Sequence, residues 1–480
     1  MKLNAMIDFW AKLKPDTPAI VMFDVIIPYQ KLSQAINAVA AHLSEKISDM
    51  AAPVGILIEH PARNIVVNCT LMRLGIPSIV VRTAQVDYLA KIGAKTLIQE
   101  GQAKPLSGIT AVKTEIPWFN DPKPPKVRRH GSAQRTKLAF TSGTTGVPKA
   151  IAFADEDIAA RSNFLRAVTG DVPWMRSLIM PGLSTNFAFS QVALAFEMGR
   201  TLSFAQSPDE ISRAIELFGV DLLAASNQQA QGLVDHLAHV KQHIRTLKCV
   251  WLGGAVPTPT LLAKINEYLC RDVVCVYAST EAHVAAFGMW NRIKHVERAV
   301  GYVCPWASVE SVDDEGAVLP AGKAGELRIK TPNQGVLHGA ASDQDDAIET
   351  WFYPGDRGLV TPDGMLVIQG RATDTINKGG VKLSASIIDQ CLAGVAGVKD
   401  AAVCAIQGSC GDEIVALVIA AQPVALATPV ALATLNAALK AAKIEATLDH
   451  VQMVDNIPRN ETGKVNRQEL QRLARARKGN

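Results

Sequence analysis

The sequence predicts an α/β protein with a large part built on a parallel sheet, a β module after it and a small α+β part at the end. In the first third and again over residues 209–277, apolar runs typical of strands alternate with segments that are apolar at helical spacing. This alternation is typical of a parallel sheet covered by helices. Residues 308–368 contain short alternating runs separated by turns rich in Asp, Pro and Gly, which indicates antiparallel strands. Beyond residue 371, strands and helices over about a hundred residues are enough for a separate small domain.

The expected elements of the large part follow one another as β-α-β units. Residues 53–59 are predicted to be a strand because they form an apolar run, and residues 64–73 a helix because apolar side chains recur at helical spacing. A strand at 75–81 completes this first unit. The same signals predict further strands at 137–140, 220–225, 248–253, 273–277, 401–406 and 414–419, and a further helix at 259–268.

Length and composition set further limits. A chain of 480 residues exceeds one ordinary core, so we expect a large N-terminal domain at 1–370 and a small C-terminal domain at 371–480. The content of 48% hydrophobic and 20% charged residues is that of a globular protein. The net charge of +4 gives no reason to expect a nucleic-acid partner. Eight cysteines without a C-x-x-C pair favour a reducing environment, which predicts a cytoplasmic protein.

Neither a secretory signal nor a membrane span is expected. The first residues contain Asp8 and no long apolar core, which is unlike a signal peptide. The longest apolar stretch, residues 414–442, is interrupted by Pro423 and Pro429. It is therefore predicted to form a strand, a loop and an Ala-rich helix.

The most informative local motif is the run from Thr141 to Lys149, which directly follows the predicted strand at 137–140. Its small residues let backbone N–H groups approach a phosphate, its hydroxyls add donors, and its lysine adds positive charge. Open α/β sheets hold ligands at strand ends, which favours a nucleotide site here. The spacing of the Walker loop is absent, and a plain Gly/Ser/Thr turn is the alternative interpretation.

Further motifs follow this loop in chain order. They are Gly253–Pro257, Tyr277–Glu281, Trp351–Gly358, Gly370–Gly380 and Pro458–Arg467. Together with the loop, they make nearly the whole chain resemble the superfamily of adenylate-forming enzymes, which comprises acyl- and aryl-CoA synthetases, peptide-synthetase adenylation domains and luciferases. Each motif alone is weak or moderate evidence, whereas the six in this order and spacing are specific.

The resemblance implies a reaction in two steps, in which ATP, Mg²⁺ and CoA take part. A carboxylate attacks the α-phosphate of ATP, pyrophosphate leaves, and a thiol then displaces AMP from the acyl-adenylate. The charge that develops at the phosphate requires a metal, a cationic side chain and aimed donors. The small C-terminal domain is implied to be mobile: one pose inserts a lysine for the first step, and the other brings the Gly379–Gly380 loop towards the thiol.

The resemblance also assigns residues to the nucleoside. Tyr277 is implied to face the adenine, with Gly254 and Ala255 on the other side. Asp356 is implied to accept hydrogen bonds from the ribose hydroxyls, and Arg371 to bind near the ribose or a phosphate. Ala278 and Ser279 belong to the same nucleotide-binding motif as Tyr277.

A second group is implied to act on the phosphates. Thr280 is implied to touch the α-phosphate, and Glu281 to coordinate Mg²⁺. Lys464 is implied to be the catalytic lysine that bridges the carboxylate and the α-phosphate. The residues implied to hold the β- and γ-phosphates are Thr141, Ser142, Gly143, Thr144, Thr145, Gly146 and Lys149.

Taken singly, these residues have ordinary structural interpretations. A Thr-Glu pair after a strand is more often a helix cap with an acidic first turn. Tyr277 alone would be core packing, and Asp356 alone a turn aspartate. An isolated Gly-Lys like that at Lys464 is normally a solvated loop, and only the frame that ends at Arg467 favours a catalytic role.

The chain departs from the family pattern at three places. Pro354 stands where threonine is usual, which removes a donor near Asp356. Thr373 stands at the pivot, where Asp or Lys is usual; threonine is stiffer at χ1 but does not forbid a hinge. Residues 184–186 replace the usual His or aromatic gate, so the wall between ATP and the acyl group is expected to be unusual.

The acid is predicted to be a plain carboxylic acid. Amino-acid-activating relatives carry an aspartate within the segment matching 184–199 to pair with the ammonium group, whereas the acidic residue here is Glu197. A buried ammonium without a partner would be costly. Phe and Met side chains favour an apolar acyl or aryl group, and the polar residues a polar substituent. The candidate pocket residues are Asn186, Phe187, Phe189, Gln191, Asn227, Gln228, Ala282, His283 and Met289.

CoA is the predicted acceptor, because the chain contains a C-terminal domain and no appended carrier domain. A freestanding enzyme that loads a separate carrier protein has the same motifs, and the sequence does not separate the two. A non-catalytic nucleotide-binding homologue is a third interpretation, which Glu281, Asp356, Arg371 and Lys464 oppose.

Overall fold

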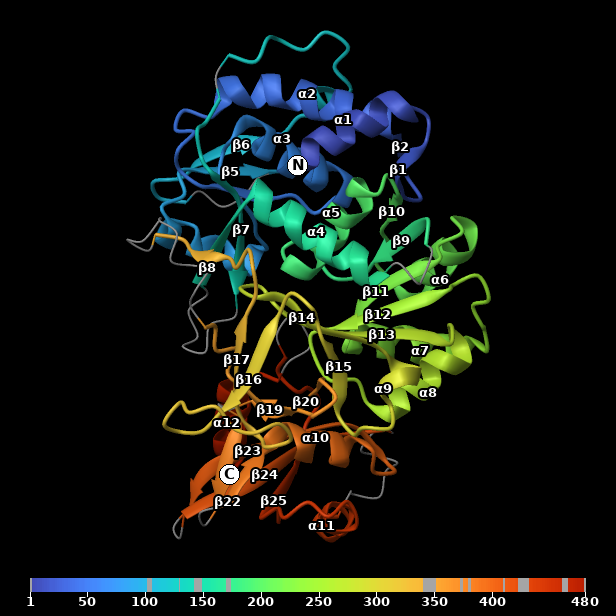
Figure 1. The fold of residues 1–480 in the computed structure, drawn as a ribbon, viewed down its shortest axis with the longest axis vertical. Coiled ribbons are helices and arrows are strands. Elements are labelled where there is room, and N and C mark those ends of the chain that lie inside the picture. The colour runs from blue at the N-terminus through green and yellow to red at the C-terminus, as the bar shows by residue number, and fades with distance from the viewer. Residues whose placement is uncertain are drawn as a thin grey trace.

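Figure 1 shows the fold of the chain in a computed structural model. The structure describes residues 2–101, 106–128, 130–141, 149–169, 174–339, 351–371, 374–378, 381–408, 411–421, 431–459 and 465–478.

The smaller of the two main sheets has the strand order β18-β8-β7-β4-β3-β5-β6 in the described residues. Its central strands run parallel, while β8 and β18 are antiparallel to their neighbours. The strands predicted at 53–59, 75–81 and 137–140 and the helix at 64–73 are confirmed. The elements are β3 (Val54–Leu57), α3 (Pro61–Leu74), β4 (Ser78–Val80), η1 (Thr83–Tyr88), η2 (Ala90–Ile92), β5 (Thr96–Gln99), β6 (Thr110–Lys113), η3 (Ile116–Asn120), β7 (Arg135–Thr141), β8 (Lys149–Ala154), α4 (Asp155–Thr169) and β18 (Val336–Leu337).

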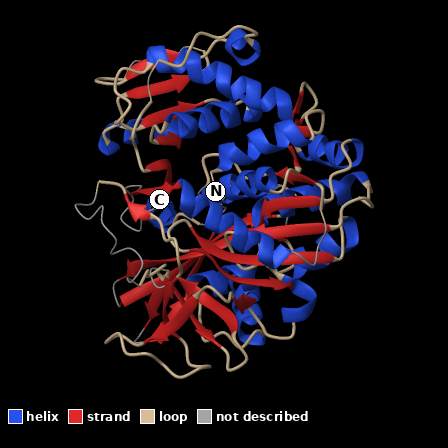
Figure 2. Cartoon of the chain, turned by 45° about the horizontal axis from the view of Figure 1, so that its top comes forward, coloured by secondary structure: helices blue, strands red, loops and turns tan. Residues whose placement is uncertain are grey.

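The larger sheet joins a parallel half to an antiparallel half. Its order in the described residues is β16-β17-β19-β20-β15-β14-β13-β12-β11-β9-β10-β1-β2. The strands from β10 to β13 are parallel, and those from β13 to β16 are antiparallel. The predicted β module is confirmed. Its antiparallel strands belong to the same sheet as the parallel strands, and β13 and β14 form the pair at which the two halves meet. Figure 2 shows the strands of both sheets in red with helices between them.

The elements of this larger sheet and its helices have the following bounds. They are β1 (Pro18–Val21), β2 (Ile26–Pro28), β9 (Arg176–Ile179), α5 (Asn186–Glu197), β10 (Thr201–Ser203), α6 (Pro208–Leu217), β11 (Leu222–Ser226), α7 (Asn227–Val240), β12 (Cys249–Gly253), α8 (Pro259–Tyr268), β13 (Asp272–Ser279), β14 (His283–Met289), α9 (Trp290–Ile293), β15 (Ala299–Val303), β16 (Ser308–Val312), β17 (Gly325–Lys330), β19 (Asp356–Val360) and β20 (Met365–Arg371).

The main core lies between the two sheets. It takes side chains from α1 (Leu3–Leu13), α2 (Tyr29–Lys46), α3 and α5, together with residues of both sheets. Helix α3 is the clearest example of a helix placed inside this core, since almost every one of its residues is buried. Pro61 in the first turn and Gly75 in the left-handed region (φ 68°) mark the ends of that helix, as their conformational preferences predict.

The C-terminal part has cores of its own, formed by residues between 376 and 474. It lies at the bottom of Figure 1, below β19 and β20. The strands predicted at 401–406 and 414–419 are confirmed, and the stretch 414–442 contains a strand and a helix, with 422–430 outside the described residues. The elements are β21 (Thr375–Lys378), β22 (Val381–Ser384), α10 (Ala385–Ala393), β23 (Val398–Gly408), β24 (Gly411–Ala420), α11 (Leu432–Ala441), β25 (His450–Met453) and α12 (Arg467–Lys478).

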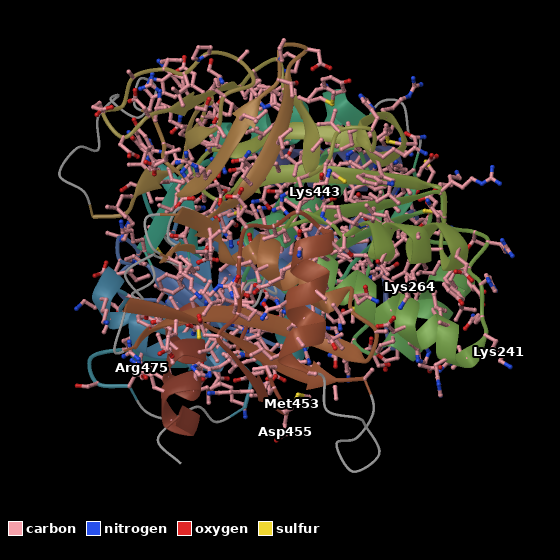
Figure 3. The ribbon with its side chains drawn as sticks, turned by 90° about the horizontal axis from the view of Figure 1, so that it is seen from below. Lys241, Lys264, Lys443, Met453, Asp455 and Arg475 are labelled. Atoms are coloured by element: carbon pink, nitrogen blue, oxygen red, sulfur yellow. The ribbon has the colours of Figure 1, made fainter. Side chains whose placement is uncertain are left out.

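Contacts near the end of β20 join the C-terminal part to the rest. Arg298 donates a hydrogen bond to Gln390 of α10. Gly370, at the end of β20, lies so close to Ser384 that a Cβ would collide with its hydroxyl. Figure 3 views the molecule from this end, with Lys443 and Asp455 labelled on the C-terminal part and Lys264 on the large part. The domain division at residues 370 and 371 stays a prediction.

None of the helices in the described residues combines the length and the apolar character that crossing a bilayer requires.

Candidate active site

Several predicted residues gather at one edge of the larger sheet because its strands are parallel. The carboxyl ends of β9, β11, β12 and β13 share this edge. Thr185 caps α5 by accepting a hydrogen bond from the Ala188 N–H (3.2 Å), which places Asn186 and Phe187 in the first helical turn. A Cβ on Gly253 would lie 3.4 Å from the Phe187 ring, which is an ordinary contact distance, so this ring lies against the end of β12.

Asn227 reaches the same edge from α7. Ser226 and Gln229 form a capping box, with Ser226 Oγ accepting from the Gln229 N–H at 3.3 Å. Asn227 therefore starts the helix, and its Nδ2 donates to the Ala255 carbonyl (3.2 Å). Asn227 Oδ1 is buried without a hydrogen-bond partner in the structure. The structure thus brings together predicted acyl-pocket and adenine-pocket residues.

Tyr277, Asp356 and Arg371 form one hydrogen-bonded group. The Tyr277 hydroxyl donates to Asp356 Oδ2 at 2.6 Å, and Arg371 Nε lies 3.2 Å from Asp356 Oδ1. Asp356 and Arg371 are also direct neighbours across β19 and β20. Burial, followed by the nearby Asp356 charge, raises the pKa of Tyr277 well above its ordinary value, so the phenol stays a donor. Arg371 also donates to the Pro354 carbonyl (2.9 Å).

This arrangement holds Asp356 rigidly while leaving it acceptor capacity. Each carboxylate oxygen has two acceptor sites, and each has one hydrogen-bonding or ionic partner in this group. The remaining sites suit hydroxyl donors such as those of a ribose. Asp356 is therefore not an ordinary turn aspartate. It is the first residue of β19, and its side chain connects this strand to Tyr277 of β13 and to Arg371 of β20.

Thr280 and Glu281 lie in the tight connection between β13 and β14. Because a strand follows them, the helix-cap interpretation is wrong. The connection is fixed by its neighbours: Ser279 Oγ accepts from the Ala282 N–H (2.9 Å), and Thr331 donates to the Ala282 carbonyl (2.7 Å).

The Glu281 carboxylate faces the strands that flank the predicted phosphate loop. Burial raises the pKa of Glu281, while a hydrogen bond from Thr141 and the charges of Arg161 and Lys149 oppose that rise. Thr141 and Lys149 pair directly across β7 and β8, at the two ends of the loop. The structure therefore brings Glu281 to the point where the loop begins and ends.

His283 begins β14 in an unusual state. Its side chain is 3% exposed, its φ is 60°, and neither ring nitrogen has a hydrogen-bond partner among the residues that the structure describes. Burial lowers the pKa of His283 well below its ordinary value, so the ring is neutral and offers one donor and one acceptor. Buried polar atoms without partners are rare in proteins, so His283 is an unusual feature of this segment.

Arg161 of α4 is a site residue that the sequence analysis missed. Its guanidinium is 4% exposed and donates to the carbonyls of Thr280 (3.0 Å), Glu281 (2.8 Å) and Asn333 (3.1 and 3.2 Å). The sequence signal was weak, because Arg161 matches no motif and its partners lie 119 to 172 residues away.

Part of the predicted site lies outside the described residues. These calls are Ser142, Gly143, Thr144, Thr145 and Gly146 of the loop, the pivot Thr373, the Gly379–Gly380 loop and the catalytic Lys464.

The segment after Lys464 is anchored firmly. Arg467 lies 2.5 Å from Asp389 and 3.4 Å from Asp374, and it donates to the Val403 carbonyl (2.7 Å). Burial raises the pKa of Asp389, while the Arg467 charge opposes that rise.

A metal ion at Glu281 would need further ligands from elsewhere. The described residues contain no group of three or more His, Cys, Asp or Glu side chains that could hold a metal. Mg²⁺ prefers oxygen ligands and is commonly held by one or two carboxylates together with substrate phosphates. The Glu281 carboxylate beside the Thr141 hydroxyl fits that pattern.

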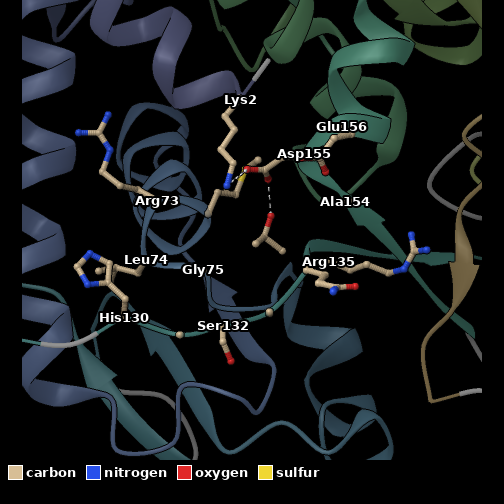
Figure 4. A pocket seen from close by; sticks show the side chains of 15 residues that line it. Lys2, Arg73, Leu74, Gly75, His130, Ser132, Arg135, Ala154, Asp155 and Glu156 are labelled. Atoms are coloured by element: carbon tan, nitrogen blue, oxygen red, sulfur yellow. Dashed lines mark hydrogen bonds and ion pairs between the residues drawn. The ribbon is translucent and has the colours of Figure 1, made fainter. Parts of the chain in front are cut away.

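A cavity of about 590 Å³ lies away from these residues (Figure 4). Lys2, Arg73 and Arg135 line it, and Lys2 lies 3.8 Å from Asp155, which accepts a hydrogen bond from Thr136. The charges are therefore partly compensated, and the predicted site residues are absent from its lining.

Comparisons with known proteins agree with this geometry. Residues 7–339 match the profile of the family described as AMP-binding enzyme. The fatty acid–[acyl-carrier-protein] ligase ScoC of Streptomyces coeruleorubidus is 26% identical over 368 residues, which are 73% of this chain and 69% of that protein. The 2-succinylbenzoate–CoA ligase of Bacillus cereus is 23% identical over 420 residues, covering 81% of this chain and 84% of that protein.

The fold also resembles that of a coenzyme A synthetase of known structure. O-succinylbenzoate coenzyme A synthetase from Bacillus subtilis, in complex with ATP and a magnesium ion, superimposes with a TM-score of 0.83 at 18% identity. The superposition covers 97% of this chain and 98% of that one, so the predicted α/β fold is confirmed over nearly its whole length.

Proposed function

Because the chain belongs to the AMP-binding enzyme family, we propose that it is an AMP-forming ligase that joins a carboxylic acid to CoA. The observation that carries this proposal is the arrangement around the end of β13. Tyr277 holds Asp356 there, and four residues further on Glu281 faces Thr141 and Lys149. A group suited to a ribose and a group suited to phosphates and Mg²⁺ thus lie along one short segment.

In the first step, the nucleotide lies with its adenine against Tyr277, Gly254 and Ala255. The ribose hydroxyls donate to Asp356, and the ion pair with Arg371 holds that carboxylate in place. Lys149 and the loop that begins at Thr141 bind the β- and γ-phosphates.

The carboxylate of the substrate attacks the α-phosphorus, and the bond to pyrophosphate breaks. Thr280 donates to the α-phosphate, and Lys464 bridges the two anions so that their repulsion does not prevent attack. When bound by Glu281 and the phosphates, Mg²⁺ supplies positive charge to the triphosphate. The acyl-adenylate then reacts with the CoA thiol, which releases AMP.

The substrate site is proposed at Asn186, Phe187, Asn227 and His283. Phe187 gives it an apolar wall beside Gly253, while Asn227 and His283 contribute polar atoms without partners in the structure. We retain a plain carboxylic acid as the substrate class.

Loading of a carrier protein is the second candidate. The similarity to a fatty acid–[acyl-carrier-protein] ligase favours it, whereas the similarity to 2-succinylbenzoate–CoA ligases favours CoA. The division into domains at 1–370 and 371–480, with a pivot at Thr373, is proposed for both candidates.

A pyrophosphate-release screen tests the proposal. Purified protein with Mg²⁺ and ATP is offered aliphatic, aromatic and dicarboxylic acids, first alone and then with CoA or an acyl-carrier protein. We expect acid-dependent pyrophosphate release and an acyl-adenylate detectable by mass spectrometry. Absence of adenylate with every acid contradicts the proposal, and thioester formed only on the carrier selects the second candidate.

A further inference from the structure

The backbone of the turn that contains Thr280 and Glu281 is hydrogen-bonded to a buried cation, Arg161. Arg161 donates to both of their carbonyls, and to that of Asn333. The Glu281 carbonyl accepts a second hydrogen bond from the Gly335 N–H (2.9 Å). Arg161 thus joins the turn and the 333–335 segment into one unit.

A second residue of helix α4, Asp157, also binds the 333–335 segment. Asn333, which has a left-handed φ of 59°, donates from Nδ2 to Asp157 Oδ1 at 3.2 Å. Asp157 lies one helical turn before Arg161 and accepts from the Ala154 N–H (2.8 Å) and from Arg135 (3.2 Å). Asn333 is therefore held by a carboxylate through its side chain and by a guanidinium through its carbonyl.

Arg161 stands on the element that continues the phosphate loop. β8 begins at Lys149, next to Thr141, and leads without a break into α4. The centre of the Phe153 ring of β8 lies 4.4 Å from the Arg161 guanidinium carbon. This cation–π contact stabilises the buried guanidinium. β8, α4 and the contact between Phe153 and Arg161 thus connect Lys149 to the Thr280–Glu281 turn.

The guanidinium is suited to this task by its shape and charge. Its planar fork presents several donors in fixed directions, so it can serve several carbonyls at once, which a lysine ammonium does less well. Burial lowers the pKa of Arg161 to about 10, which leaves it charged at neutral pH. Within the described residues, its hydrogen bonds go to the carbonyl oxygens of Thr280, Glu281 and Asn333, so the cation acts on the backbone of the turn and of the 333–335 segment.

We propose that Arg161 is a positioning residue that keeps the Thr280–Glu281 turn in register with Thr141 and Lys149 at the ends of β7 and β8. This inference rests on the proposed function, in which the turn meets the α-phosphate and Mg²⁺. A displacement of about 1 Å at such a site can cost about 100-fold in rate, so a side chain that fixes two backbone carbonyls has a large effect.

The test compares Arg161→Met and Arg161→Lys with the control Arg166→Met, which removes a charge from the exposed face of the same helix. ATP binding is measured by calorimetry with and without Mg²⁺, and acid-dependent pyrophosphate release gives kcat and KM. For Arg161→Met we expect ATP binding without Mg²⁺ to stay within about threefold, the gain from Mg²⁺ to disappear, and kcat to fall about 100-fold. Arg161→Lys should recover about tenfold of kcat, and the control should match the wild type.

Two results overturn the inference. One is an Arg161→Met variant whose kcat and Mg²⁺ dependence equal those of the wild type. The other is an equal loss of binding with and without Mg²⁺, which indicates general damage rather than positioning. If Arg161→Met does not fold, Arg161→Lys decides: a wild-type kcat overturns the inference, and a reduced kcat at an unchanged thermal midpoint supports it.

The two proposals fail separately. A wild type that forms no adenylate with any acid refutes the proposed ligase. The calorimetric comparison of Mg²⁺-dependent ATP binding still decides the role of Arg161 in that case.

Discussion

Lys137 is a buried cation whose replacement is expected to stabilise the protein. It lies in β7, between Ser78 of β4 and Phe153 of β8, and its side chain is 2% exposed. Its ammonium sits 4.6 Å from the centre of the Phe189 ring. Burial lowers the pKa of Lys137 from 10.5 to about 7, while the Cys69 thiol acts in the opposite direction.

The size of the effect follows from the two pKa values. The unfolded chain binds the proton more tightly than the folded chain, so stability rises with pH between about 7 and 10.5 and is flat below that window. At pH 7 the cost of burying this amine is about 4 kcal/mol. Lys137→Met removes that cost but also loses the cation–π contact, worth about 1–2 kcal/mol, so a net gain of about 2–3 kcal/mol is expected.

Urea unfolding followed by tryptophan fluorescence measures this gain, since Trp174 and Trp251 are fully buried. The variant is expected to unfold at higher urea than the wild type at pH 7, and the difference is expected to shrink as the pH rises to 9.5. Lys113→Met, at an exposed position in the same sheet, is the control. A lower midpoint for Lys137→Met at pH 7, or a difference that does not change with pH, refutes the reasoning.

Three further predictions concern the site. Tyr277→Phe removes the donor to Asp356 and is expected to raise KM for ATP about 5- to 10-fold with little change in kcat, measured at saturating acid; an unchanged KM contradicts the ribose role of Asp356. Lys464→Ala is expected to lose pyrophosphate exchange yet still convert a supplied acyl-adenylate to thioester, and unchanged exchange activity refutes its catalytic role. Asp389→Asn weakens the anchor of Arg467 and is expected to reduce exchange at least about tenfold while changing thioester formation less than about threefold; equal losses in both half-reactions would show that the anchor does not act through the lysine segment.

Local signals in the sequence were enough to predict the strands that carry the nucleotide motifs. Tyr277 ends an apolar run and Thr280 comes three residues later, and parallel strands place their carboxyl ends at one edge. The apolar run is visible in neighbouring residues, and the common edge follows from the general geometry of parallel sheets. Asn227 and Gly254 were instead assigned from the family resemblance, and in the structure each directly follows its own strand, β11 and β12.

The buried cations could not be predicted in this way. Arg161 and Lys137 lie on a helix and a strand where a charged residue normally faces water. Their burial depends on partners far along the chain, such as Asn333 and Phe189. Likewise, the pairing of β15 with β20 joins the β module to the parallel sheet through a contact that spans more than sixty residues, and no local pattern specifies it.

Arg371 is the last residue of β20, two positions before the predicted pivot Thr373. Its guanidinium is committed to Asp356 and to the Pro354 carbonyl. A nucleotide bound at Asp356 would therefore share this carboxylate with Arg371, close in sequence to the predicted pivot. The proposed ribose site and the predicted pivot are in this way connected through the Arg371 side chain.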